Sequence, residues 1–105
     1  MANDNNLKEL QSIEQSMQSI AVQKQNVQVQ LAEIDSALRE IEGKEVAYKI
    51  VGSILIEAKP ADLATELTEK KDVAEVRLRT LEKQETRLRE RFDAVQKGVL
   101  DEMNK

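Results

Sequence analysis

The sequence predicts a mainly α fold, an antiparallel two-helix coiled coil whose helices are joined by one β-hairpin, with a single domain over residues 1–105. Charged residues make up 34% of the chain and aromatic residues 2%, so the large side chains of a compact core are nearly absent. Apolar residues recur at coiled-coil spacing on both sides of one short central segment. That segment alternates apolar and polar residues, which is typical of a strand.

The first helix is predicted over residues 6–42. Asn6 followed by Glu9 resembles a capping box at its start, and Gly43 suits the left-handed residue that follows a helix. Its apolar residues alternate steps of three and four, the heptad pattern of a coiled coil, and Lys24 is the one interruption. They are Leu10, Ile13, Met17, Ile20, Val27, Leu31, Ile34, Leu38 and Ile41.

A β-hairpin is predicted over residues 44–59. Gly52 lies where a tight turn requires a positive φ, which predicts two strands of about five or six residues folded back at residues 51–53. An isolated two-stranded hairpin is marginal in water. The segment therefore either pairs with other chains or serves as an elaborate turn.

The second helix is predicted over residues 60–103. Pro60 suits a first helical position, and Asp62 places negative charge at the positive end of the helix dipole. Lys71 and Glu85 interrupt its apolar seam, and we interpret them, like Lys24, as residues that fix register rather than as a site. The seam consists of Ala64, Leu67, Lys71, Ala74, Leu78, Leu81, Glu85, Leu88, Phe92, Val95 and Val99.

A hairpin reverses the chain, so the two helices are expected to run antiparallel with residue i facing approximately residue 102 − i. Apolar residues then face apolar residues along the seam. The pairs predicted in this way are Leu10 with Phe92, Ile13 with Leu88, Ile34 with Leu67, and Leu38 with Ala64.

Composition excludes several classes of function. The chain has no Cys and no His, which removes thiolate chemistry, imidazole base catalysis and the commonest metal ligand, and it has no Gly-rich phosphate loop. We therefore expect no enzyme, no cofactor and no metal site. A net charge of −4 argues against nucleic-acid binding. Without a signal-like start or an apolar run of about 20 residues, we expect a soluble cytoplasmic protein with no membrane association.

Three stretches carry a resemblance to a known family: AVQKQNVQVQLAEIDSALREIE in the first helix, YKIVGSILIE in the hairpin and RLRTLEKQETRLRERF in the second helix. The order of helix, hairpin and helix resembles the β-class subunit of archaeal-type prefoldin. The α class of that family carries two hairpins, and residues 44–60 leave room for one.

The resemblance implies an ATP-independent holdase that captures non-native polypeptides and passes them to a cytosolic group II chaperonin. It also implies a hexamer of two α-class and four β-class subunits, which pool their hairpins into a β-barrel from which six coiled-coil arms hang. The hairpin residues expected to mediate this assembly are Val46, Tyr48, Ile50, Gly52, Ile54 and Ile56.

The family binds its clients at the arm tips, and the residues agree with that location. The last apolar side chains of a two-helix seam have nothing to cover them, and Gly98 costs about 1 kcal/mol relative to Ala inside a helix. Met side chains suit irregular partners. The candidate client contacts are Leu7, Leu10, Ile13, Met17, Phe92, Val95, Val99, Leu100 and Met103.

A second interpretation is an adaptor or spacer subunit of a larger assembly that has no chaperone activity. The two differ at the arm tip, because a spacer should bind one partner there and a holdase should bind many unfolded chains.

Overall fold

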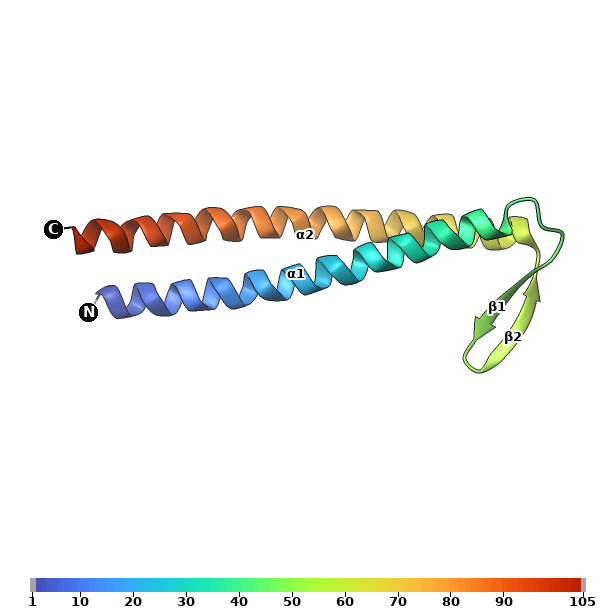
Figure 1. Cartoon of the computed structure of the whole chain (residues 1–105), viewed down its shortest axis with the longest axis horizontal. Helices are drawn as coiled ribbons and strands as arrows, with labels where there is room; N and C mark the ends of the chain where they lie inside the picture. Colours follow the sequence, from blue (N-terminus) through green and yellow to red (C-terminus); the bar gives the residue numbers. More distant parts are fainter. Residues whose placement is uncertain (1, 105) are drawn as a thin grey trace. The chain divides into compact units, whose positions relative to one another are not determined.

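The computed structural model describes residues 2–104. Helix α1 (Ala2–Ile41) is followed by strands β1 (Ala47–Val51) and β2 (Ile54–Ala58) and by helix α2 (Pro60–Met103). In Figure 1 the segments of α1 run opposite in direction to the segments of α2 beside them. The prediction of a mainly α fold with one hairpin between two long helices is confirmed.

The chain divides into two compact units. The chain-end unit contains the residues up to Asn26 and those from Leu78 onward, and the hairpin unit contains Val27–Arg77. Both helices are continuous through the two ranges. Whether the whole chain behaves as the single domain predicted from the sequence stays a prediction.

In the chain-end unit, apolar side chains spaced one heptad apart are buried between the two helices. Ile13 and Ile20 of α1 and Leu81 of α2 are buried. Because seven residues make two turns of a helix, these side chains lie on one face of each helix. Glu9 pairs with Arg91 at 2.7 Å and Lys24 with Glu85 at 3.2 Å, so residue numbers fall along α2 as they rise along α1 and the two segments pack antiparallel.

The hairpin unit repeats this arrangement with its own residues. Val27 and Ile34 of α1 and Ala74 of α2 are buried. Leu38 and Ala64, which the sequence predicts to face each other, line the same small hollow near the hairpin.

The start of α1 corrects the predicted first helix, because the helix begins at Ala2 and Asn6 lies inside it. Residues 2–5 contain no Pro or Gly, and Asp4 in the first turn favours the helix dipole. Several Asn and Asp residues could each cap a helix here, so the pattern of Asn6 and Glu9 did not identify the start.

The other helix ends agree closely with the prediction. Helix α1 ends at Ile41, whose carbonyl accepts a bond of 3.2 Å from the Lys44 N–H, and Gly43 has a φ of +73°. Helix α2 begins at Pro60 and ends at Met103, and the Lys59 carbonyl accepts a bond of 3.0 Å from the Leu63 N–H.

The two strands pair antiparallel around a two-residue turn, Gly52 and Ser53. Gly52 has a φ of +62° and no non-Gly residue that the structure describes has a positive φ, which is typical of a type II′ hairpin. Val51 pairs with Ile54, so the turn is one residue shorter than the predicted turn at residues 51–53. This pairing decides which strand residues share a face.

Candidate functional site

One face of the hairpin is apolar and exposed. Tyr48 is paired with Glu57 and Ile50 with Leu55, and paired residues of an antiparallel ladder point to the same side. Tyr48, Ile50 and Leu55 are all exposed. Leu55 was absent from the residues predicted for this surface, because its face depends on the register that the turn sets.

The other face of the hairpin carries Ile54 and Ile56, so these two predicted residues lie opposite Tyr48 and Ile50. Ala47 on this face is buried, and the Lys49 ammonium lies 3.4 Å from the Glu66 carboxylate of α2. These contacts hold the base of this face against α2. Ile54 and Ile56 remain exposed, as does Val46 just before β1.

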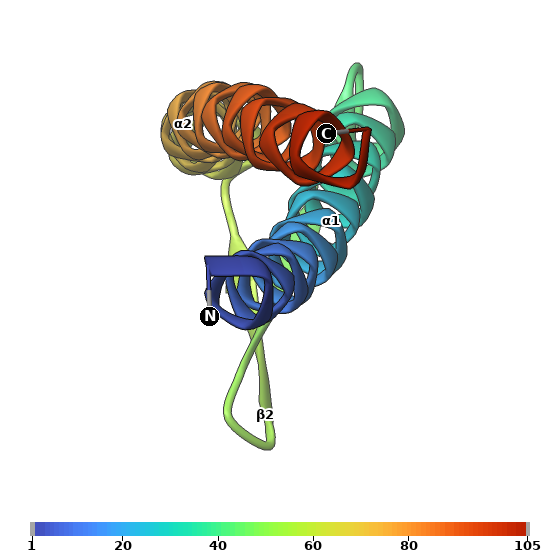
Figure 2. The same cartoon turned by 90° about the vertical axis from the view of Figure 1, so that its left-hand side faces the viewer.

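Both outer edges of the hairpin are open. The sheet has two strands, so among the residues that the structure describes each strand has a neighbour on one side only. Figures 1 and 2 show the strands leaving the adjoining helix ends and the turn projecting away from them. Open edges and two apolar faces together make a surface that can add strands from another chain.

The residues predicted as client contacts all lie in the chain-end unit, but their exposure differs. Ile13 is only 3% exposed, so its side chain belongs to the packed seam. Leu7, Leu100 and Met103 are exposed. The remaining five are half-buried residues of the predicted seams: Leu10, Met17, Phe92, Val95 and Val99.

Two of these residues, Met17 and Phe92, line one open hollow between the helices of this unit. Ala21 adds to its apolar floor, and Glu85 and Arg89 lie at its sides. Its volume of about 370 Å³ is room for one or two side chains rather than for a folded domain. Glu14 and Gln18 complete its lining, so the hollow is partly apolar and partly polar.

The last turns of α2 are weakly stabilised. Gly98 has no heavy atom within 4 Å of the position a Cβ would take, so packing does not require glycine there. The last turn has no basic residue, and Asp101 and Glu102 place negative charge near the negative end of the helix dipole. Both features lower the stability of this helix end.

Ion pairs connect the two helices at the polar seam positions. Lys24 and Glu85, which interrupt the two seams, pair with each other at 3.2 Å. In the hairpin unit Lys71 lies 2.8 Å from Asp35, and this hydrogen-bonded carboxylate raises the pKa of Lys71 above its usual value. The sequence identified these residues as register determinants but did not identify their partners.

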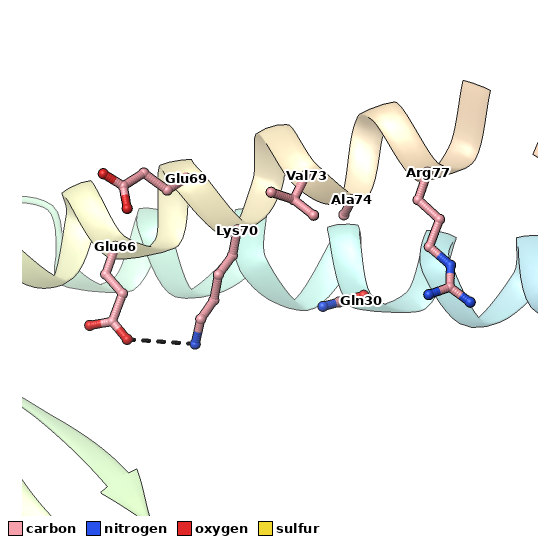
Figure 3. A pocket seen from close by; sticks show the side chains of 7 residues that line it. All are labelled: Gln30, Glu66, Glu69, Lys70, Val73, Ala74 and Arg77. Carbon is pink, nitrogen blue, oxygen red and sulfur yellow. Dashed lines mark ion pairs between the residues drawn. The ribbon is translucent and has the colours of Figure 1, made fainter. Parts of the chain in front are cut away.

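A shallow hollow of the hairpin unit has mixed lining. Figure 3 shows its lining, Gln30 from α1 and six residues of α2, and the ion pair of Glu66 and Lys70, whose charged atoms are 3.6 Å apart. Its charged groups are of both signs: Glu66, Glu69, Lys70 and Arg77. Among residues 2–104 no three His, Cys, Asp or Glu side chains are grouped so that they could hold a metal ion. Within the same residues, neither helix has a stretch apolar enough to cross a membrane.

A family model described as "Prefoldin subunit" matches residues 4–105, almost the whole chain. The chain belongs to the prefoldin subunit family. A solved structure of the prefoldin beta subunit from Thermococcus strain KS-1 superposes with a TM-score of 0.91 at 34% identity, over 99% of this chain and 94% of that one. The helix, hairpin and helix of this chain are therefore those of a prefoldin beta subunit.

Curated prefoldin relatives agree over a shorter stretch. The prefoldin subunit beta of Archaeoglobus fulgidus is 43% identical over 61 residues, which are 58% of this chain and 53% of that protein. The prefoldin subunit beta of Methanocella arvoryzae is 45% identical over 64 residues, 61% of this chain and 50% of that protein. The chain thus matches about half the length of these curated relatives.

Proposed function

We propose that this chain is the β-class subunit of a heteromeric prefoldin that acts as an ATP-independent holdase. In this role it captures non-native polypeptides and delivers them to a group II chaperonin in the cytoplasm. The observation that carries the proposal is that one chain exposes two distinct apolar surfaces: the hairpin, and the helix segments with Leu7, Leu100 and Met103. One surface suits assembly and the other suits clients.

Assembly is assigned to the hairpin because its open edges and apolar faces need strands from other subunits. Two α-class and four β-class hairpins closing into a barrel would remove those edges. Tyr48, Ile50 and Leu55 would then pack against neighbouring hairpins, while Lys49 keeps the hairpin base at α2.

Client binding is assigned to the chain-end unit. Its exposed Leu and Met side chains and the hollow beside Met17 and Phe92 offer apolar contacts of no fixed shape. Such contacts suit many unrelated sequences, since Met adapts to irregular partners. Several arms acting together would raise the overall affinity for one unfolded chain.

The assembly is tested by analytical ultracentrifugation of the chain alone and with an α-class subunit. We expect a monomer or small oligomer alone, and a hetero-hexamer once the partner is supplied. A stable folded monomer under both conditions would count against the assignment of the hairpin to assembly.

The activity is tested by the aggregation of a denatured protein in the presence of the assembled hexamer. We expect equal suppression with and without ATP and with and without a chelator. Stimulation by ATP or loss with chelator would contradict a nucleotide-free and metal-free mechanism. An intact hexamer that suppresses no aggregation would favour the adaptor or spacer role instead.

A further inference from the structure

A basic face on α2 stands out in an acidic chain. The net charge of the chain is −4, yet residues 78–91 contain five basic residues and three acidic ones. The basic residues are Arg79, Lys83, Arg87, Arg89 and Arg91, and the acidic residues are Glu82, Glu85 and Glu90. All of them lie on α2 within the chain-end unit.

Three of these cations form a stripe along one side of the helix. Arg79, Lys83 and Arg87 follow each other at four-residue spacing, so their side chains stand one above the other. Arg79 and Lys83 are each two residues from the buried Leu81, which is about 200° around the helix. Arg79 and Lys83 therefore point away from α1, whereas Arg87 also borders a hollow with Ser16 and Ile20 of α1. All three residues are exposed.

The neighbouring cations are already engaged, whereas the stripe is not. Arg91 pairs with Glu9 at 2.7 Å, and Arg89 lies 4.0 Å from Glu85. Within the part of the chain that the structure describes, no carboxylate lies within 4.0 Å of a stripe cation. The stripe cations instead line one open hollow on the outside of α2, together with Glu82, Thr86 and Glu90.

We infer that the stripe of Arg79, Lys83 and Arg87 is a docking surface for an acidic segment of a partner protein. On a partner helix, carboxylates four residues apart are spaced about 6 Å along the helix axis. The three cations have the same spacing along α2. Each cation could then meet one carboxylate. The inference goes beyond the proposed holdase activity, because these contacts are ionic and lie on the outer face of α2 rather than on its apolar residues.

Nucleic acid fits this surface less well. A nucleic-acid backbone carries closely spaced charge along its whole length and calls for a continuous basic surface. Glu82 and Glu90 stand beside the stripe and would repel phosphates there. Discrete carboxylates one turn apart can meet the cations and avoid these two acids.

The test uses the full chain and a fluorescein-labelled, alanine-based peptide with glutamates at i, i+4 and i+8. Fluorescence anisotropy should show binding that weakens as salt is raised, because exposed charges are screened. The triple variant Arg79→Gln, Lys83→Gln, Arg87→Gln should weaken binding about tenfold, as three exposed ion pairs would. Lys83→Gln alone should weaken it about two- to threefold.

A matched control changes the net charge equally but elsewhere: Lys44→Gln, Lys59→Gln, Lys97→Gln. This control should stay within about twofold of the unchanged chain, and circular dichroism should show the same helix content for every variant. Equal weakening by both triple variants would overturn the inference, as would equal binding of a peptide with Gln in place of Glu. A single-stranded oligonucleotide that binds more tightly than the peptide and depends on the same stripe would also overturn it.

Discussion

Two isoleucines of the hairpin unit differ widely in how much of the side chain is exposed to solvent. Ile34 of α1 is 6% exposed, because α2 covers it, whereas Ile50 of β1 is 75% exposed. Burying an Ile side chain contributes about 1.5–3 kcal/mol. At Ile34 the chain makes that contribution within itself, whereas at Ile50 it does not.

This difference shows that an apolar pattern predicts whether a segment forms a helix or a strand. It does not predict which part of this or another chain buries its apolar side chains. A heptad pattern repeated in two helices of one chain can be satisfied within the chain. A five-residue strand pattern repeated twice cannot, since two strands leave both edges open. Apolar burial within the single chain therefore lies mainly between the helices, and the proposed assembly would supply it at the hairpin.

The largest expected effect is on assembly, and it tests whether the exposed residues of the hairpin bind other subunits. Ile54→Asp should abolish hexamer formation while the helical circular dichroism of the chain stays nearly unchanged, because the charge would be buried without a partner among strands. Sedimentation with the α-class subunit measures the assembly.

Val73→Asp is the matched control, since Val73 is 71% exposed but lies on α2 away from the hairpin strands. The control should assemble normally. If Ile54→Asp assembles as well as Val73→Asp does, exposure on the hairpin has no special role.

The next prediction tests whether client binding and assembly use different parts of the chain. Deleting residues 1–10 together with 96–105 removes Leu7, Leu10, Val99, Leu100 and Met103 but no strand residue. The truncated chain should still enter the hexamer and should lose most of its suppression of aggregation, because weak contacts from several arms multiply. Light scattering of a denatured protein measures this. Full protection by the truncated hexamer would move the client surface elsewhere.

A smaller effect is expected on the stability of the isolated chain, and it tests the contribution of the residues buried between the helices. Ile34→Ala should lower the free energy of unfolding by about 2–4 kcal/mol, because it leaves a cavity in the seam. Ile50→Ala, the control in the same unit, should change it by less than about 0.5 kcal/mol. Urea unfolding followed by circular dichroism would detect the contrast, and equal losses at both positions would contradict it.

The ion pair of Lys24 and Glu85 tests whether a polar seam position stabilises the helices. Glu85→Leu should destabilise the chain by about 1–3 kcal/mol, because it leaves the partly buried Lys24 without a partner. The double variant Lys24→Leu, Glu85→Leu should recover this loss or exceed the original stability. A double variant that is clearly less stable than the unchanged chain would contradict this expectation and show that the pair supplies net stability.

The smallest effect concerns pH. Asp35 raises the pKa of Lys71 in the folded chain, so the pair stabilises fully below the ordinary lysine pKa and loses this contribution as pH rises through the raised value. Above about pH 10.5 we expect a slight extra loss of stability that Lys71→Gln removes. Urea unfolding at neutral and strongly alkaline pH measures it, and no difference between the two chains would contradict the pairing.

Much of the fold could be predicted because its signals are local. Gly43, Gly52 and Pro60 each fix one backbone position, and the structure places all three as expected. The start of α1 could not be fixed in this way, because several residues before Asn6 can also begin a helix. The predicted client contacts stay a prediction.

The features that could not be predicted from the sequence depend on the register of the strand pair and of the helix pair. Leu55 shares a face with Ile50 only because the turn has two residues rather than three. Lys24 and Glu85 are 61 residues apart in the chain, so identifying them as partners needs the packed position of both helices. Heptad spacing gives the seam of each helix but leaves such pairings undetermined.

The contacts across the chain also set an order in which it can fold. Lys49 and Glu66 are separated by 17 residues, Lys24 and Glu85 by 61, and Arg91 and Glu9 by 82. Closing a longer loop costs more entropy, although the increase is slow, so contacts near the turn form first and shorten the loops for the rest. We expect the helices to join progressively from the hairpin toward the chain ends. Opening runs the other way, so the segments with Leu7 and Met103 can separate at low free-energy cost while the hairpin base stays formed.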